Sequence, residues 1–297
     1  MKRLLSCYPS EYQNYNRIEL KQSIFASEGR IILGETVVTA APLLEGVSNA
    51  EMMAAFGCDL LLLNEFDVFT RFINGFYENE NPINEIKKIT GRLIGINLEP
   101  VDDTAMMIDK KVNISSGRMA SIKAVSEAEK QGVDFLLLTG NPSTGVTTMS
   151  IKESITIARE NFSRLIFAGK MHGAGTQEDI LNKKELLEYI DLGADGVIIP
   201  AVGTVPGVSE EDARIVTRAV KKKGGMVIST IGTSQESADS ETIRDISLCN
   251  KRVGVDIHHI GDGGYGRMPT PENILKMSIT VRGKRHTYFR IAQSILR

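Results

Sequence analysis

The chain has 297 residues, of which 42% are hydrophobic and 24% are charged, and its formal net charge is −2. This balance excludes the general electrostatic attraction by which basic proteins bind nucleic acid or anionic membranes. No apolar stretch approaches the roughly 18 residues of a membrane-spanning helix, and the three scattered cysteines lack metal-ligand spacing, so we expect a cytoplasmic protein with no nucleic-acid or membrane partner.

Short apolar runs organise the chain, and each is followed by polar or glycine-rich residues and then by a helix-like stretch. The runs are Thr36–Ala40, Leu60–Leu63, Leu93–Ile96, Phe135–Leu138, Leu165–Ala168, Gly196–Ile199, Met226–Ser229 and Val255–Ile260. Their apolar character is continuous rather than alternating, which is typical of parallel strands covered on both faces. Eight such strand–helix units predict an α/β fold, a closed (β/α)8 TIM barrel.

The predicted barrel accounts for most of the chain. We predict a single domain over residues 1–297, with an N-terminal extension (1–34), the barrel (35–280) and a C-terminal helical tail (281–297). Within the extension, Arg17–Ser27 is predicted to form a helix that covers the amino end of the barrel. Ser48 with Glu51, and Ser150 with Glu153, have the spacing of capping boxes and predict helix starts.

A barrel of this kind binds its ligand at the carboxyl ends of the strands, so the residues after each run are site candidates. The second, third and fourth runs are followed by Asn64, Glu65, Asp67, Asn97, Glu99 and Asn141. Carboxylates on neighbouring strands can hold a divalent cation such as Mg²⁺ or act as acid and base. Alternatively, Glu65 and Asp67 face solvent or cap the next segment. No cofactor is certain, and the metal stays an open alternative.

The fifth run leads into the segment with the most reactive side chains. Lys170 can form a Schiff base if its pKa is lowered, or it can hold a phosphate or carboxylate. His172 can transfer protons near neutral pH. The structural alternative is that the lysine lies between helices and the histidine caps one.

The last two runs are followed by glycine-rich loops of the kind that bind phosphate through backbone amides. The candidates are Gly232, Thr233, Ser234, Gly261, Gly263 and Gly264. Asp262 would repel a phosphate unless a metal or lysine intervenes. His258 and His259 alternate across their strand, and we predict that His259 points into the barrel.

Several of these segments resemble the BtpA/SgcQ family of (β/α)8 proteins. Leu61–Phe69 is similar to that family's second strand, Ile94–Leu98 with Asp102 and Asp103 to its third, and Ile166–Ala168 with Lys170 and His172 to its fifth. Ala194–Ile199 is similar to its sixth unit. The similarity covers roughly residues 36–294 in short pieces and implies the barrel fold. Members have been described as nucleosidases and as a photosystem-biogenesis factor.

The chain departs from that family's pattern at positions that carry chemistry. The order Asn64-Glu65 is reversed, the arginine of the third strand is missing, and the lysine–histidine spacing differs. His258, His259 and Asp262 stand where the family has mainly apolar residues and a small hydroxyl. These departures put the reaction in doubt more than the fold.

The function that we predict is enzymatic. The substrate is expected to be a small phosphorylated, sugar-derived metabolite, and the enzyme a lyase or aldolase, an isomerase or a nucleosidase-like hydrolase. Lys170 would steer or activate the substrate, and His172 would transfer protons. Glu99 with Asn97 would act as base or metal ligand, and His259 is a further catalytic candidate. We expect a homo-oligomer.

Two alternatives belong to other classes. The first is a non-catalytic barrel that binds a metabolite or partner. The second is a phosphohydrolase of haloacid-dehalogenase type, suggested by Leu61–Thr70. That chemistry needs a nucleophilic aspartate two residues before the acid/base Asp67, and position 65 holds glutamate.

Overall fold

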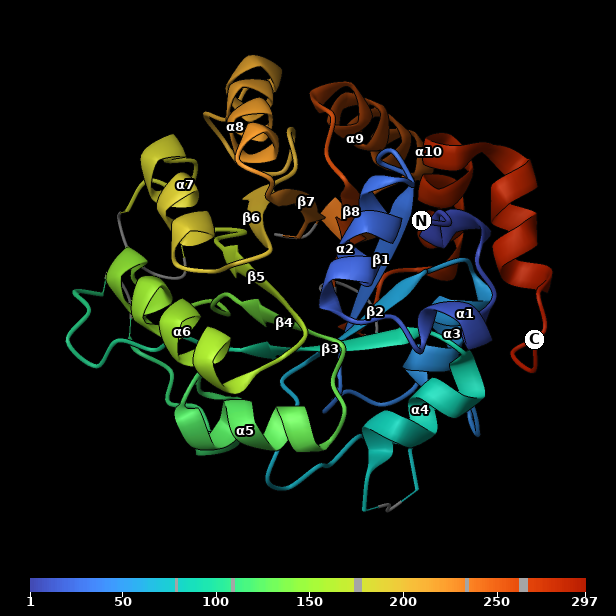
Figure 1. The fold of residues 1–297 in the computed structure, drawn as a ribbon, viewed down its shortest axis with the longest axis horizontal. Coiled ribbons are helices and arrows are strands. Elements are labelled where there is room, and N and C mark those ends of the chain that lie inside the picture. Colours follow the sequence, from blue (N-terminus) through green and yellow to red (C-terminus); the bar gives the residue numbers. More distant parts are fainter. Residues whose placement is uncertain (78–79, 108–109, 174–177, 233–234, 262–266) are drawn as a thin grey trace.

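The computed structural model describes residues 1–77, 80–107, 110–173, 178–232, 235–261 and 267–297. Within them, eight parallel strands form a closed barrel in chain order, and β8 pairs with β1 (Figure 1). The strands are β1 (Ile31–Val37), β2 (Leu60–Asn64), β3 (Leu93–Leu98), β4 (Phe135–Leu138), β5 (Leu165–Gly169), β6 (Gly196–Pro200), β7 (Met226–Ile231) and β8 (Ile257–Ile260). The predicted (β/α)8 barrel is confirmed.

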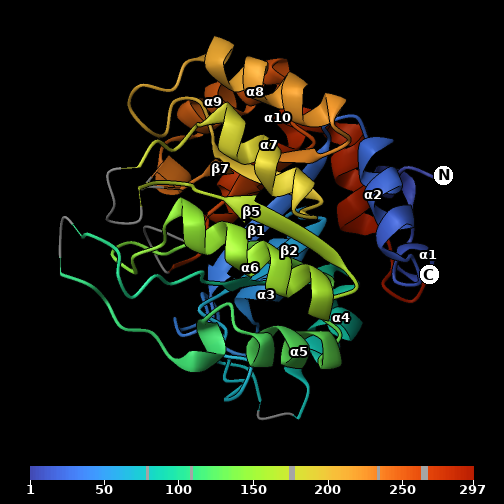
Figure 2. The same cartoon turned by 60° about the vertical axis from the view of Figure 1, so that its left-hand side comes forward.

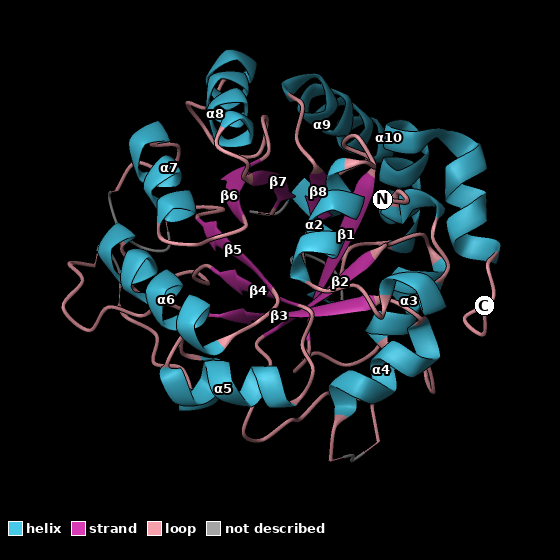
Figure 3. Ribbon diagram, in the orientation of Figure 1, coloured by secondary structure: helices cyan, strands magenta, loops and turns pink. Residues whose placement is uncertain are grey.

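Helices surround the ring of strands (Figure 3). They are α1 (Pro9–Tyr12), α2 (Arg17–Phe25), α3 (Asn49–Ala55), α4 (Pro82–Thr90), α5 (Ile122–Lys130), α6 (Thr148–Asn161), α7 (Lys183–Asp191), α8 (Glu210–Lys222), α9 (Ser240–Val253) and α10 (Pro271–Ala292). Short 3-10 turns are η1 (Leu4–Ser6), η2 (Ser116–Arg118) and η3 (Gln235–Ser237). Among the described helices, none has the length and apolar character needed to cross a membrane.

One of the two predicted capping boxes is confirmed and the other is wrong. Ser48 caps α3, and Glu51 returns the hydrogen bond to the Ser48 backbone. At α6 the cap is Thr147, whose side chain accepts from the backbone N–H of Ser150. The Ser150 hydroxyl accepts from the backbone N–H of Thr147 at 3.0 Å and donates to the carbonyl of Pro100 at 2.6 Å, so Ser150 completes the capping box of Thr147 instead of starting one with Glu153.

The lumen of the barrel is apolar toward its amino end. One buried cluster contains Ile31, Leu33, Leu60, Leu62, Leu93, Phe135, Leu137, Leu165, Phe167, Ile198, Met226, Ile228 and Ile257. The α2 residues Leu20 and Ile24 belong to the same cluster, so α2 covers this end as the sequence predicted. Figure 2 shows α1, α2 and both chain termini together at this end. A ligand therefore has to reach the lumen from the opposite, carboxyl end.

The first strand begins earlier than the sequence predicted. It spans Ile31–Val37 rather than Thr36–Ala40, so residues 31–34, which we had placed in the extension, are part of the barrel. A glycine and a buried acid interrupt the apolar run and conceal the strand. Gly34 lies against α3 and the start of β2, where an added Cβ would be 2.6 Å from the sulfur of Cys58. Glu35 faces the lumen, two positions after Leu33.

His258 lies on the helix-facing side of β8 and makes stability depend on pH. It is fully buried, and its Nε2 lies 3.2 Å from the carbonyl oxygen of Gly29. Burial lowers the pKa of His258 to about 4. Because the unfolded chain takes up this proton near pH 6.5, stabilisation present above pH 6.5 is lost as the pH falls toward 4. We expect a loss of about 2.5 kcal/mol between pH 7 and pH 4.5, measured by urea denaturation.

The control for this prediction is His258→Gln, which keeps a donor for Gly29 but does not titrate. Its free energy of unfolding should depend less on pH between 7 and 4 than that of the wild type. Equal dependence in the two proteins would show that His258 is not the group responsible.

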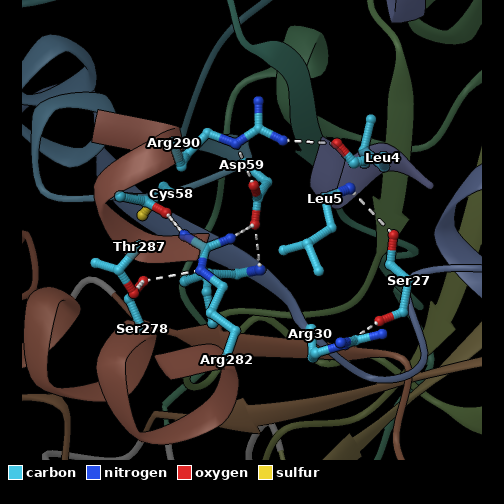
Figure 4. A network of polar contacts seen from close by, with 12 residues as sticks. Leu4, Leu5, Ser27, Arg30, Cys58, Asp59, Ser278, Arg282, Thr287 and Arg290 are labelled. Carbon is cyan, nitrogen blue, oxygen red and sulfur yellow. Dashed lines mark hydrogen bonds and ion pairs between the residues drawn. The ribbon is translucent and has the colours of Figure 1, made fainter. Parts of the chain in front are cut away.

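A buried ionic network joins both ends of the chain to the barrel (Figure 4). Asp59, which precedes β2, pairs at 2.6 Å with Nη1 of Arg282 and at 2.6 Å with Nε of Arg290. Both arginines lie on α10, on either side of a break in helical geometry at Gly283. Arg290 also donates to the carbonyl of Leu4 at 2.7 Å. The network thus fixes the last part of α10 and the amino terminus against the barrel.

Candidate active site

Polar side chains gather at the carboxyl end of the lumen, in a region that we call the mouth. It comprises Glu35, Asn64, Asn97, Glu99, Thr139, Asn141, Lys170, His172, Thr230 and His259. All of these except Asn141 and His172 are buried. Electrostatic interactions link opposite walls of the mouth, because Glu99 affects the pKa of both Glu35 and His172. Seven strands or the loops that follow them therefore contribute to one centre.

Glu35 and His259 form a buried pair on the β1–β8 side of the mouth. His259 Nε2 lies 2.7 Å from Glu35 Oε2. Burial, and then the charges of Glu236 and Glu99, raise the pKa of Glu35 to about 8. At neutral pH the Glu35 carboxyl group therefore retains its proton, next to the ring nitrogen of His259. His259 faces the lumen as predicted, whereas Glu35 was missed because it lies inside a strand that the sequence concealed.

Glu99 is held rigidly on the β3–β4 side. Arg118 Nη2 donates to its Oε1 at 2.9 Å, Asn141 Nδ2 donates to the same oxygen at 2.8 Å, and the Asn141 backbone N–H donates to Oε2 at 2.8 Å. Charge-assisted donors on both oxygens stabilise the carboxylate and fix its position. Arg118, from η2 in the long connection after β3, carries no signal in the sequence that would have placed it here.

The three predicted asparagines come together. Asn64 Nδ2 donates to Asn141 Oδ1 at 2.9 Å, and Asn141 Nδ2 donates back to Asn64 Oδ1 at 3.1 Å. Asn97 Nδ2 donates to the same Asn64 oxygen at 3.2 Å. This amide cluster joins the ends of β2 and β3 to the loop after β4 and presents uncharged polar groups.

Lys170 and His172 follow β5. The Lys170 ammonium is buried and donates to Glu178, which also accepts from the backbone N–H of Thr148 at the start of α6. Burial lowers the pKa of His172; Glu99 opposes this change and Lys170 adds to it. His172 is therefore neutral at physiological pH and can accept a proton.

A glycine sets the path of the chain into this segment. Gly169 has φ +154°, and a Cβ there would lie 2.2 Å from the carbonyl oxygen of Ile198. Only glycine allows β5 to approach β6 this closely, so Gly169 determines where Lys170 emerges.

Glu65 and Asp67 make loop contacts at the edge of the mouth, where Glu65 lies 3.9 Å from Nη2 of Arg118, the partner of Glu99. Glu65 accepts from the hydroxyl of Thr39 at 2.9 Å and from Nη2 of Arg267 at 3.1 Å. Asp67 accepts from the backbone N–H groups of Phe69 and Thr70, which closes a turn. The alternative that we raised for both, a capping or solvent-facing role, describes these contacts.

The predicted phosphate loops are described only in part. An added Cβ at Gly261 would lie 2.8 Å from the carbonyl oxygen of Ile231 and 3.5 Å from Cα of Gly232, so the ends of β7 and β8 are close. Thr233, Ser234, Asp262, Gly263 and Gly264 lie outside the described residues. The fully buried Glu236 follows Gly232 on η3. Phosphate binding here stays a prediction.

The residues described do not fit a metal centre. Among them, no group of three or more His, Cys, Asp or Glu side chains is placed to hold a metal ion. Glu99, the carboxylate predicted as a ligand, has both oxygens hydrogen-bonded by Arg118 and Asn141. The chemistry derived below uses the chain's own groups.

Comparison with known proteins gives one family match. The model of a family described as "Domain of unknown function (DUF7916)" matches residues 5–297. No curated protein matches the chain.

Solved structures share the fold at low sequence identity. A lyase/mutase from Burkholderia cenocepacia J2315, whose assignment is provisional, has 17% identity and a TM-score of 0.52, covering 87% of this chain and 83% of that chain. An archaeal fructose 1,6-bisphosphate aldolase has 13% identity and a TM-score of 0.56, with coverages of 88% and 97%. A 2,3-dimethylmalate lyase of the PEP mutase/isocitrate lyase superfamily has 15% identity and a TM-score of 0.50, with coverages of 82% and 80%. At this identity the likeness shows the fold alone.

Proposed function

The chain belongs to the DUF7916 family, and we propose that it is an enzyme that acts by acid–base chemistry on a small phosphorylated, sugar-derived metabolite. The observation that carries this proposal is the buried Glu35–His259 pair in the same mouth as Lys170 and the fixed Glu99. Groups that titrate near neutral pH at the carboxyl end of a barrel are typical of active sites. Assignment to the BtpA/SgcQ family is proposed only on the short segments quoted above.

The mouth suits the cleavage or rearrangement of a hydroxylated carbonyl compound. In an aldolase-type cleavage, a base takes the proton of a hydroxyl group and the adjoining C–C bond breaks. The released electron pair then moves toward the carbonyl group, and a proton returns to carbon. The Glu35–His259 pair and neutral His172 can transfer these protons, and the Lys170 ammonium can stabilise the negative charge on oxygen. Isomerisation and nucleosidase-like hydrolysis also need proton transfer and the stabilisation of developing charge.

Solved structures with this fold include an aldolase and a lyase, which supports cleavage as the first reaction class to test. A fold alone does not fix a reaction, so the proposal depends on the mouth. The haloacid-dehalogenase alternative has no support there. Position 65 holds glutamate rather than the required aspartate, and Glu65 is engaged by Thr39 and Arg267.

A non-catalytic barrel is the second candidate, and one feature favours it. Lys170 is paired with Glu178, and Glu99 is paired with Arg118, so these charges are already balanced within the protein. Such pairs can serve structure or ligand binding without turnover.

The test of the proposed function is turnover of a panel of sugar phosphates by the wild type, Lys170→Met and Lys184→Met. Lys184 is the matched control, because its side chain is 87% exposed on α7. We expect the wild type and the control to convert at least one compound, and Lys170→Met to be slower by about 100-fold or more. Borohydride trapping on Lys170 identifies a Schiff base; loss of activity with EDTA indicates a metal instead. Tight binding without turnover by any of the three proteins favours the non-catalytic barrel.

A further inference from the structure

Two buried polar atoms of the mouth have no hydrogen-bond partner among the residues that the structure describes. They are Oδ1 of Asn97 and Oγ1 of Thr139. Each residue is only 3% exposed. Native proteins pair nearly all such atoms, so two of them together at the site need an explanation.

The direction of the Asn97 amide is fixed by its neighbour. Its Nδ2 donates to Asn64 Oδ1, an oxygen that can only accept, and the amide oxygen must therefore lie on the other side. Asn97 alternates with the outward-facing Ile96 and Leu98 and so faces the lumen.

Thr139 lies beside Asn97 on the neighbouring strand. The register pairs Asn97 with Leu137 and Leu98 with Leu138, and Thr139 comes next. Leu137 faces the lumen and Leu138 faces outward, so the alternation returns Thr139 to the lumen side. The two atoms thus share one wall of the mouth.

The charges around this wall disfavour an anion. Glu99 lies next to it, directly after β3, and Glu236 is fully buried near the opposite wall. The only cation bonded to Glu99 among the described residues is Arg118, which balances that carboxylate and also lies 3.9 Å from Glu65. Lys170, which follows the neighbouring β5, is paired with Glu178. Asn64, Asn97 and Thr139 are themselves uncharged. A neutral ligand group that can both donate and accept hydrogen bonds matches such a wall. A hydroxyl group is the simplest group of this kind.

We infer that Asn97 and Thr139 form a subsite for the hydroxyl groups of a polyol chain. Asn97 Oδ1 accepts from a ligand hydroxyl, and the Thr139 hydroxyl exchanges a second hydrogen bond with the ligand. This inference rests on the proposed function and gives the substrate an orientation. The neutral hydroxylated end lies in the lumen, and the anionic end stays outside it, toward the loops.

Thr139→Val removes the hydroxyl at constant shape, and Thr217→Val is its matched control. Thr217 on α8 is also buried, and its hydroxyl has no hydrogen-bond partner among the described residues, but it lies outside the mouth. Both variants should be at least as stable as the wild type without ligand, because each loses an unpaired hydroxyl. Thr139→Ser retains the hydroxyl and should behave as the wild type.

The probes are ribitol and inorganic phosphate, and the measurements are the thermal midpoint and calorimetric titration. Ribitol should raise the Tm of the wild type, Thr217→Val and Thr139→Ser, and should bind Thr139→Val about tenfold more weakly. The response to phosphate should be the same in all four proteins.

Three results would overturn the subsite. The first is an equal ribitol effect in Thr139→Val and the wild type, which is the general stabilisation that polyols give. The second is no ribitol effect in the wild type. The third is a loss of stability in Thr139→Val but not in Thr217→Val, which would mean that the Thr139 hydroxyl is already bonded in the ligand-free protein. The subsite proposal and the proposed enzymatic function can be disproved independently. Ribitol binding can depend on Thr139 even if Lys170→Met does not change turnover, and turnover can depend on Lys170 even if ribitol binding does not depend on Thr139.

Discussion

Asp59→Asn is expected to lower the free energy of unfolding by about 3–5 kcal/mol, the usual result of breaking a buried ion pair from one side. Burial by itself would raise the pKa of Asp59, but Arg282 and Arg290 outweigh it and hold the pKa below its ordinary value. The side chain is therefore a carboxylate at neutral pH, and both arginine side chains beside it are buried. The asparagine would leave two buried guanidinium groups without their counter-charge.

Urea denaturation at pH 7 measures this loss, and Asp191→Asn is the control. Asp191 pairs with Lys223 at the surface, where its side chain is 60% exposed. Exposed pairs contribute about 1 kcal/mol or less, so the control should stay close to the wild type. If Asp59→Asn also stays within about 1 kcal/mol of the wild type, the network does not secure α10 to the barrel.

His259→Asn is expected to lower kcat by about 10²- to 10⁴-fold on the substrate identified in the sugar-phosphate panel, the usual contribution of a general acid or base. His259 is the member of the buried pair that can pass a proton between Glu35 and the mouth. Asparagine can still hydrogen-bond Glu35 but cannot accept a proton. The effect should therefore appear in kcat more than in KM.

The neighbouring histidine is the matched control. His258 occupies the next position of β8 but faces away from the lumen and bonds the Gly29 carbonyl. His258→Asn should retain turnover in the fraction that is folded, as judged by circular dichroism. A Glu35→Gln variant should change the pH profile of kcat, because it removes the carboxyl group whose pKa is raised to about 8. Equal losses in the two histidine variants, with an unchanged pH profile for Glu35→Gln, would remove the pair from the mechanism.

Most of the barrel could be predicted from the sequence, because parallel strands buried on both faces leave continuous apolar runs. Phe135–Leu138, for example, has the predicted bounds. The bounds of the first strand could not be predicted, because Gly34 and Glu35 interrupt its apolar run. Gly34 allows close packing against α3, and Glu35 faces the lumen.

The candidate site divides in the same way. Asn97 lies near the end of β3, and Glu99 and Lys170 directly follow β3 and β5, so the strand order alone places them at the carboxyl end of the barrel. Arg118 and Glu236 come from connections whose paths depend on tertiary contacts. Their positions had no local signal. Glu35 is the most important site residue that the sequence did not predict. A buried acid inside a strand interrupts the apolar run, so the sequence pattern indicates that the strand has ended.

The most direct test of the whole account is a crystal structure of His259→Asn with the substrate identified in the panel. The account predicts electron density for the substrate at the carboxyl end of the barrel. Its hydroxylated end should lie within hydrogen-bond distance of Asn97 Oδ1 and Thr139 Oγ1, and its phosphate should lie outside the lumen, toward Gly232 and Gly261. A substrate bound elsewhere on the barrel, or one with its phosphate in the lumen against Asn97, would contradict it.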